Sequence, residues 1–237
     1  MQVILVRHGE TEYNAQGRLQ GYSPVPLSIR GRQQAMLIGP RVRPLRPTVL
    51  YSSDIQRAHE TAMILSEHIG LPVQLCPGLR EWNIGTWIDR MLADFYAHLT
   101  AIGAHPATHV PEGGESQVQS QARMVTQMQD WANQHAEATI LGVSHGTAID
   151  LFVRHILGLD IRQMPPYRIA NASINIFRYQ EKQWEIVTLN DIGLTASKDG
   201  SMSPIDVTDI FERARGAARE KHFPRQGLGA RRAKMIL

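Results

Sequence analysis

Short apolar runs alternate along this chain with segments whose apolar positions recur at helical spacing. Runs rich in β-branched residues predict buried strands, whereas apolar residues three and four positions apart predict helices that bury one face. The predicted strands cover residues 2–6, 48–51, 73–75, 139–143, 173–179 and 184–189, and a polar turn joins the last two. The predicted helices cover residues 28–38, 53–69, 116–135 and 147–157.

Residue types at the helix ends agree with these boundaries. Ser28 is a suitable N-cap for the first helix, and Ser53 or Asp54 is a suitable N-cap for the second. Gly70 and Pro72 end the second helix. Strands interleaved with helices predict an α/β fold, a three-layer α/β/α sandwich with a mostly parallel central sheet. Functional sites in such sheets form beyond the carboxyl ends of the strands.

Composition narrows the class of protein. The 237 residues include a single cysteine, Cys76, which excludes an internal disulfide and a zinc site built from several cysteines. The net charge of +3 is too small to indicate a nucleic-acid partner. No apolar stretch reaches the roughly 18 residues of a membrane helix, and the apolar run at 2–6 is too short for a signal peptide. We therefore expect a cytoplasmic protein that binds neither nucleic acid nor membrane.

Charge is distributed unevenly at the C-terminal end. Residues 222–237 contain no acidic residue, and Pro and Gly are interspersed among the basic ones, which predicts a flexible basic tail. A solvated terminus is the simpler interpretation, and a weakly bound acidic partner is the alternative. The basic residues are Arg225, Arg231, Arg232 and Lys234.

Two predicted strands end in a histidine followed at once by glycine. His8 follows the first strand after Arg7, and His145 follows the 139–143 strand and precedes Gly146. Glycine allows backbone N–H groups to approach an anion closely, and the helix that begins after His145 adds positive potential. Arg57 lies in the first turns of the helix that follows the second strand. Three strand ends therefore direct two arginines and two histidines to one region.

These residue types suit a phosphoryl group in transfer. Arginine presents a rigid fork of donors that matches phosphate oxygens, and phosphoryl transfer needs positioning and charge neutralisation above all. Neighbouring arginines lower the pKa of an imidazole and so favour its neutral, nucleophilic form. A leaving alkoxide needs a proton, for which Glu81 is the best candidate donor.

The same residues belong to a longer series of motifs, and this series resembles the histidine phosphatase superfamily, also called phosphoglycerate-mutase-like. The motifs occur in the family's order and spacing over roughly residues 1–195. They are Arg7-His8-Gly9-Glu10-Thr11, Asn14, Gly17 to Gly21, Pro26-Leu27-Ser28, Gly31, Gln34-Ala35, Ser52-Ser53, Arg57-Ala58, Thr61-Ala62, Leu79-Arg80-Glu81, Gly85-Thr86-Trp87, Pro111 to Ser116 and Val143-Ser144-His145-Gly146.

The resemblance implies a role for each matching position. His8 would be the nucleophile that becomes phosphorylated, and Glu81 would be the general acid and then the general base. Arg7, Arg57 and His145 would hold the transferred phosphoryl group. The implied substrate-binding residues are Asn14, Gln20 and Gly146. The resemblance implies a small phosphorylated metabolite as substrate, no metal and no cofactor, and it leaves a homodimer open by analogy with relatives.

The resemblance also divides the chain. Residues 1–195 would form the histidine phosphatase domain, and residues 196–237 would form a C-terminal extension with a helix at about 206–221 followed by the basic tail. Departures from the family pattern occur at Asn83, at Ile88-Asp89 and at Asn190 to Leu194. They spare the catalytic positions but leave the substrate open among phosphoserine, a sugar phosphate, a sugar-acid phosphate and a phosphorylated cofactor precursor.

Three functions compete at this point. A phosphatase is favoured because the segment 88–115 is shorter than the insertion by which a mutase shields its phosphoenzyme from water. A phosphoglycerate mutase is the first alternative, and a non-catalytic phosphate-binding protein on the same fold is the second. Two local questions also stay open: whether Trp82 and Trp87 line the pocket mouth or pack beneath the loop, and whether residues 91–99 form a lid helix or ordinary core.

Overall fold

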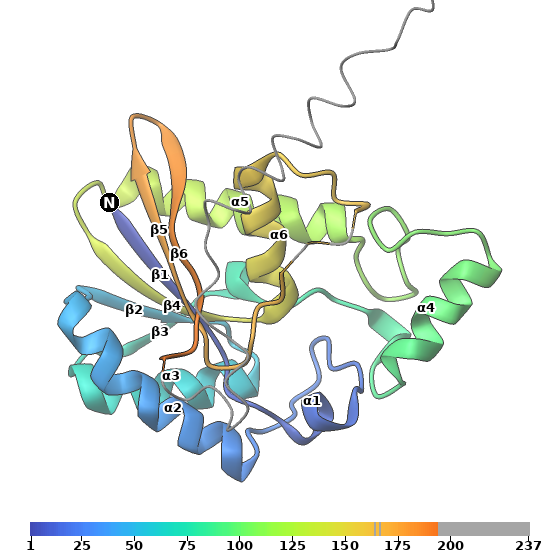
Figure 1. Cartoon of the computed structure of the whole chain (residues 1–237), viewed down its shortest axis with the longest axis horizontal. Coiled ribbons are helices and arrows are strands. Elements are labelled where there is room, and N and C mark those ends of the chain that lie inside the picture. Colours follow the sequence, from blue (N-terminus) through green and yellow to red (C-terminus); the bar gives the residue numbers. More distant parts are fainter. Residues whose placement is uncertain (164, 166, 194–237) are drawn as a thin grey trace, which may run out of the picture.

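The computed structural model describes residues 1–163, 165 and 167–193, and a six-stranded sheet lies at its centre (Figure 1). The strand order is β3-β2-β4-β1-β5-β6. The first four strands in the sequence are parallel to one another. Strand β5 pairs antiparallel with β1, and β6 pairs antiparallel with β5. The strands are β1 (Gln2–Arg7), β2 (Val49–Ser52), β3 (Val73–Leu75), β4 (Thr139–Ser144), β5 (Ile174–Gln180) and β6 (Gln183–Asp191).

Helices cover both faces of the sheet. α2 (Ile29–Val42) and α3 (Gln56–Ile69) cover one face, and α5 (Gln117–Gln134) and α6 (Gly146–Leu157) cover the other (Figure 1). The three-layer α/β/α fold with a mostly parallel sheet is therefore confirmed. The shorter elements are α1 (Glu12–Gln16), α4 (Leu92–Ala101) and the 3₁₀ turns η1 (Arg43–Leu45), η2 (Pro77–Leu79) and η3 (Gly85–Trp87).

Strand β1 is the buried centre of this arrangement. Val3 and Leu5 pack in the cluster with α5 and α6, whereas Ile4 and Val6 pack in the cluster with α2 and α3. All four side chains are 0 % exposed, and burial of each contributes about 1.5–3 kcal/mol. The pairing of β1 with β4 in parallel brings Arg7 beside Ser144. The residues that follow these two strands, His8 and His145, consequently emerge side by side.

Most predicted boundaries are confirmed, and one cap is wrong. Ser28 caps α2 by accepting from the Gly31 amide, and Ser116 caps α5 in a reciprocal pair with Gln119. Helix α3, in contrast, has Ile55 as its N-cap, with no side-chain capping bond. The Ser53 hydroxyl lies 2.8 Å from His145 Nε2, so this serine serves the site more than the helix.

Helix α4 lies away from the sheet on a small cluster of its own, where Phe95 and Leu99 pack against Trp82 and Ile84 (Figure 1). None of the described helices combines the length and the apolar character needed to span a membrane. The helix expected at 206–221 and the basic tail fall outside the described residues.

Candidate active site

His8 stands at the end of β1, where its surroundings fix the proton on its ring. The side chain is 1 % exposed. Nδ1 lies 2.6 Å from the Gly9 carbonyl oxygen, and Arg57 Nε donates to Nε2 at 3.2 Å. A carbonyl oxygen only accepts and a guanidinium N–H only donates. Nδ1 therefore carries the proton, and Nε2 presents its lone pair.

Burial and charge keep this imidazole neutral. Burial lowers the pKa of His8 well below its ordinary value of 6.5, and the cations of Arg57 and Arg7 lower it further. The hydrogen bond to Gly9 opposes this shift but is the weakest of the four influences. A neutral ring whose Nε2 carries no proton is the form that attacks phosphorus.

Two arginines frame His8. Arg57 is 1 % exposed and is oriented by the carbonyls of Gly21 and Ser23, at 2.8 Å and 3.2 Å. Burial lowers the pKa of Arg57 to about 10, so the group stays charged at neutral pH. Arg7 donates to the Ile169 carbonyl at 2.5 Å, and its Nε is buried with no partner among the described residues. Guanidinium N–H groups that have no partner and lie beside a nucleophile form a site for an anion.

His145 completes the set from the end of β4. Its ring centroid lies 5.2 Å from that of His8, and the two planes meet at 61°. The ring is 0 % exposed, and burial, followed by the charge of Arg57, lowers its pKa well below 6.5. Nε2 pairs with the Ser53 hydroxyl, while Nδ1 is buried with no partner within the described part of the chain.

The predicted acid, Glu81, is held by backbone amides. Oε1 accepts from the N–H groups of Trp82 at 2.8 Å and Ala148 at 3.2 Å, and Oε2 accepts from Thr147 at 3.3 Å. Two of these donors belong to the first turn of α6. The glycine and helix start after His145 predicted an anion at this helix N-terminus, and the structure shows that the Glu81 carboxylate accepts from the amides of Thr147 and Ala148 there.

Arg123 supports the Glu81 loop, and sequence reasoning missed it. From α5 it donates to the carbonyl oxygens of Gly78, Arg80 and Glu81, at 2.9–3.1 Å, and to Glu115 Oε1 at 2.7 Å. A single arginine within a helical pattern reads as a surface residue, so no local signal identified it. Its three bonds to the carbonyls of this loop exist only once α5 lies against the loop.

The predicted substrate-binding residues line the same cavity as four of the predicted catalytic residues, Arg7, His8, Arg57 and Glu81, whereas His145 is fully buried and absent from the lining. Asn14 Oδ1 accepts from Asn171 Nδ2, which also donates to the His8 carbonyl, both at 3.2 Å. Gln20 accepts from the Thr11 hydroxyl at 2.9 Å. Asn171 is thus a second residue that sequence reasoning missed, since it arrives from the loop before β5.

Gly146 lies against a guanidinium. A Cβ atom at this position would lie 3.2 Å from Arg7 Nε and 3.3 Å from Cζ. Such contacts are tight, so a side chain here would displace Arg7. Glycine is consequently required here for packing against Arg7, in addition to allowing the backbone N–H groups to approach an anion closely.

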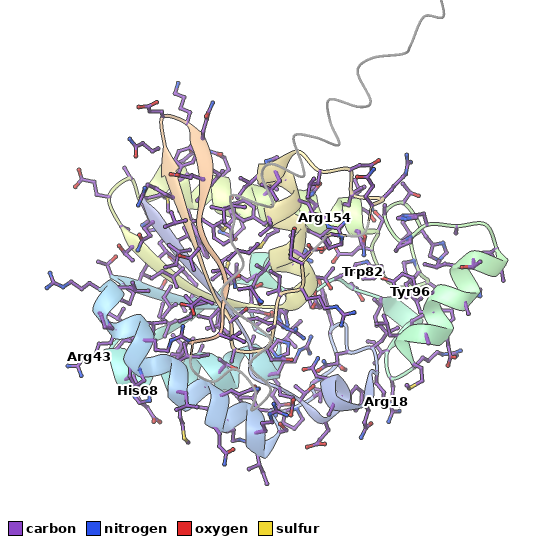
Figure 2. The ribbon with its side chains drawn as sticks, in the orientation of Figure 1. Arg18, Arg43, His68, Trp82, Tyr96 and Arg154 are labelled. Carbon is purple, nitrogen blue, oxygen red and sulfur yellow. The ribbon has the colours of Figure 1, made fainter. Side chains whose placement is uncertain are left out.

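The cavity extends beyond the catalytic residues. Its volume of about 1020 Å³ exceeds what a phosphate ion alone fills. Trp82 and two residues of α4, Leu92 and Tyr96, line it, and Figure 2 shows Trp82 and Tyr96 in the region between α6 and α4. Trp82 therefore both lines the cavity and packs on Phe95, whereas Trp87 is absent from the lining and packs on Phe95. Helix α4 is likewise both local core and cavity wall.

Within residues 1–163, 165 and 167–193, no three histidine, cysteine, aspartate or glutamate side chains gather closely enough to hold a metal ion.

Comparison with known proteins identifies relatives of this arrangement. The model of the histidine phosphatase superfamily (branch 1) matches residues 3–192. A protein of Escherichia fergusonii named "Probable phosphoglycerate mutase GpmB" is 35% identical over 189 residues, which cover 78% of this chain and 87% of the relative.

Two similar solved structures are phosphatases. A mycobacterial glucosyl-3-phosphoglycerate phosphatase in complex with VO3 is 29% identical, with a TM-score of 0.72, and the match covers 80% of this chain and 99% of that one. A phosphoserine phosphatase of Entamoeba histolytica in complex with 3-phosphoglyceric acid is 25% identical, with a TM-score of 0.71 and coverage of 80% and 96%.

Proposed function

The chain belongs to the histidine phosphatase superfamily, and from that membership we propose that it is a metal-independent phosphomonoester hydrolase that forms a phosphohistidine on His8. The observation that carries the proposal is the state of the His8 ring. Nδ1 is held by the Gly9 carbonyl, and the Nε2 lone pair faces the guanidinium of Arg57 in a cavity with room for an ester. The proposed substrate is a small phosphorylated metabolite.

The first half of the reaction moves the phosphoryl group to the enzyme. His8 Nε2 attacks phosphorus, a nitrogen–phosphorus bond forms, and the bond from phosphorus to the ester oxygen breaks. Glu81 gives its proton to the departing oxygen, which leaves as an alcohol. Arg7 and Arg57 neutralise the charge of the phosphoryl oxygens, and the neutral His145 helps to orient them, with Asn14 adding a contact and the Gly146 backbone lying close beside it.

The second half returns the enzyme to its starting state. Glu81, now a carboxylate, takes a proton from a water molecule as the water oxygen attacks phosphorus. The nitrogen–phosphorus bond breaks, and its electron pair returns to Nε2. Inorganic phosphate leaves, so that one water is consumed for each ester cleaved.

Two observations favour hydrolysis over phosphoryl return to the substrate. Solved structures similar to this chain carry phosphatase names. The segment between η3 and α5 is short and contributes a single helix, α4, to the cavity wall. A phosphoglycerate mutase stays the second candidate because the curated relatives carry that name. The non-catalytic alternative is disfavoured because all five catalytic positions are occupied by the expected residues.

Rapid quenching after mixing with a labelled phosphomonoester tests the chemistry. We expect an acid-labile, base-stable phosphoenzyme that is lost in His8→Ala and kept in His155→Ala, a matched change at an exposed histidine of α6. Labelled 3-phosphoglycerate, with and without 2,3-bisphosphoglycerate, then separates the two candidates. Isomerisation faster than phosphate release would establish the mutase, and an unlabelled His8 would overturn both.

A further inference from the structure

One wall of the cavity is apolar. We call it the α4 wall, and its five side chains are Leu19, Trp82, Ile84, Leu92 and Tyr96. Trp82 and Ile84 belong to the small core on which α4 lies, and Leu19 packs against the same core. The proposed reaction uses none of the five, so the apolar character of this wall has another cause.

Two side chains of the α4 wall stay uncovered. Leu92 is 44 % exposed and Tyr96 is 40 % exposed. They are four residues apart on α4 and therefore project from the same side of the helix. Apolar side chains that stay exposed along a concave site are typical of a surface that a ligand covers.

Tyr96 faces across the cavity toward α6. Partial burial raises the pKa of Tyr96, and the opposing charges of Arg154 and Asp150 on α6 also act on its hydroxyl. Both of these α6 residues line the cavity, and Figure 2 shows Tyr96 on the side of α4 that faces α6. The exposed part of the ring is therefore turned toward the cavity.

The α4 wall offers few polar atoms to a ligand. The indole N–H of Trp82 donates to the Glu115 carbonyl at 2.6 Å, and on the facing helix Arg154 and Asp150 pair with each other at 2.8 Å. Apart from the Tyr96 hydroxyl, the wall is hydrocarbon. A group rich in hydroxyls would lose hydrogen bonds to water here without replacement, whereas an apolar group gains by burial.

The position of the α4 wall relative to Glu81 says which part of a substrate it meets. Trp82 directly follows Glu81, and its backbone amide donates to Glu81 Oε1 at 2.8 Å. In the proposed reaction the oxygen that takes the Glu81 proton belongs to the leaving group. The body of the leaving group therefore extends from Glu81 along the α4 wall, and the cavity of about 1020 Å³ has room for it.

We propose that the α4 wall binds an apolar portion of the leaving alcohol, so that the substrate is the phosphate ester of an alcohol with an alkyl or aromatic body. This inference rests on the proposed function for the position of the ester, whereas the apolar contact itself does not depend on turnover. It disfavours phosphoserine and simple sugar phosphates among the substrates that the family resemblance left open.

Binding to the His8→Ala protein tests the inference without turnover. Calorimetry compares ethyl phosphate, hexyl phosphate, 2-phenylethyl phosphate and ribose 5-phosphate. Each fully buried methylene strengthens binding about fourfold, so hexyl phosphate should bind at least about tenfold more tightly than ethyl phosphate even if its chain is half covered. We expect 2-phenylethyl phosphate to bind like hexyl phosphate and ribose 5-phosphate to bind no more tightly than ethyl phosphate.

Variants of α4 locate the contact. Leu92→Gln and Tyr96→Gln keep the length of the side chain and suit a helix, and each should lower the ratio of hexyl to ethyl affinity at least about threefold. Both positions are exposed, so the melting temperature should stay within a few degrees. Ile102→Gln is the matched control, because Ile102 is 52 % exposed at the C-terminal end of α4 and is absent from the cavity lining.

The outcomes separate this inference from the proposed function. Equal affinity for hexyl and ethyl phosphate, or an unchanged ratio in Leu92→Gln and Tyr96→Gln, overturns the apolar subsite, whatever the phosphohistidine experiment shows. A dimer that dissociates in these variants while the ratio stays unchanged would assign the wall to a second copy of the chain. A lowered ratio in a protein that never labels His8 supports the subsite and overturns the hydrolase. The ratio of kcat/KM values in the unsubstituted protein keeps the test available if His8→Ala fails to fold.

Discussion

The Nε–H of Arg57 donates to Nε2 of His8 across 3.2 Å. The same guanidinium is fixed by the carbonyls of Gly21 and Ser23, so it cannot turn away from the ring. In this arrangement a proton on Nε2 would face a cation at hydrogen-bonding distance. The pair thus keeps the nucleophilic nitrogen unprotonated and places a phosphate-binding group beside the position that the phosphorus would take.

Replacement of Arg57 by Gln should therefore change both rate and pH dependence. We expect kcat/KM to fall about 10²–10³-fold, as for loss of a transition-state donor. Removal of the cation also relieves one of the influences that lower the pKa of His8, so the acidic limb of kcat/KM should move up toward 6.5. Rates across the pH range measure both effects. A lower rate with an unmoved acidic limb would contradict the role assigned to the charge.

Glu81→Gln should discriminate among leaving groups. An alkoxide needs the proton of Glu81, so hydrolysis of alkyl phosphates should fall about 10²–10⁴-fold. The nitrophenolate of p-nitrophenyl phosphate needs little help, and its release should fall far less. The glutamine oxygen can still accept from the amides of Trp82 and Ala148, but its NH2 group then faces the Thr147 amide donor, which costs about 1–3 kcal/mol of folding stability.

Glu112→Gln is the matched control for this experiment, because Glu112 is exposed. It should alter neither the leaving-group dependence nor the stability. Equal losses of Glu81→Gln activity on alkyl and nitrophenyl esters would argue that Glu81 orients the site and does not transfer a proton.

Arg123→Met tests support of the Glu81 loop. The change removes donors to the carbonyls of Gly78, Arg80 and Glu81, so the carboxylate should lose its fixed position. We expect kcat on alkyl phosphates to fall about tenfold with a smaller change in KM, since a misplaced acid affects the chemical step. Nitrophenyl ester hydrolysis should change little. Arg32→Met, which removes a surface pair with Glu60, is the control and should retain kcat.

Elements of the fold were predicted correctly where a residue does in the folded protein what its local sequence pattern indicates. The buried run at residues 2–6 predicted β1 to within one residue, and the cap at Ser28 is confirmed because its hydroxyl meets the Gly31 amide. The cap expected at Ser53 or Asp54 is wrong, because the Ser53 hydroxyl lies 2.8 Å from His145 Nε2 and the Asp54 carboxylate accepts from Arg80, both partners distant in sequence. Helix α1 went unpredicted because Glu12–Gln16 is too short to show a helical period.

The residues of the candidate site could likewise be predicted only where they belong to a local sequence pattern. Histidines after strands and an arginine at a helix start are visible as a local pattern, and the structure brings His8, Arg57 and His145 together. Arg123 and Asn171 have no such pattern, since their bonds form only when α5 and the loop before β5 pack against the site.

The two buried histidines should make stability depend on pH in the mildly acidic range. In the unfolded chain each has a pKa near 6.5, and in the folded protein burial and Arg57 hold both pKa values well below this. Below pH 6.5 the unfolded state therefore binds more protons than the folded state, and unfolding becomes easier as pH falls. We expect a loss of about 1.4 kcal/mol per pH unit for each histidine until its folded pKa is reached, measured by urea unfolding between about pH 7 and 5.

The variant His8→Asn/His145→Asn isolates this effect, because asparagine takes up no proton in either state. Its stability should change far less over the same range, whereas His155→Asn, at an exposed position, should retain the full slope. Burial raises the pKa of Asp150, so this carboxylate opposes the histidine slope as pH falls, but it does so in both proteins and the difference between their slopes still reports the histidines. Arg80 holds the pKa of Asp54 below its ordinary 3.8, so stability from that pair is present above 3.8 and is lost only as pH falls toward the lower, folded value. An equal slope in the double variant would mean that other groups carry the acid sensitivity and that His8 is protonated in the folded protein more readily than its burial implies.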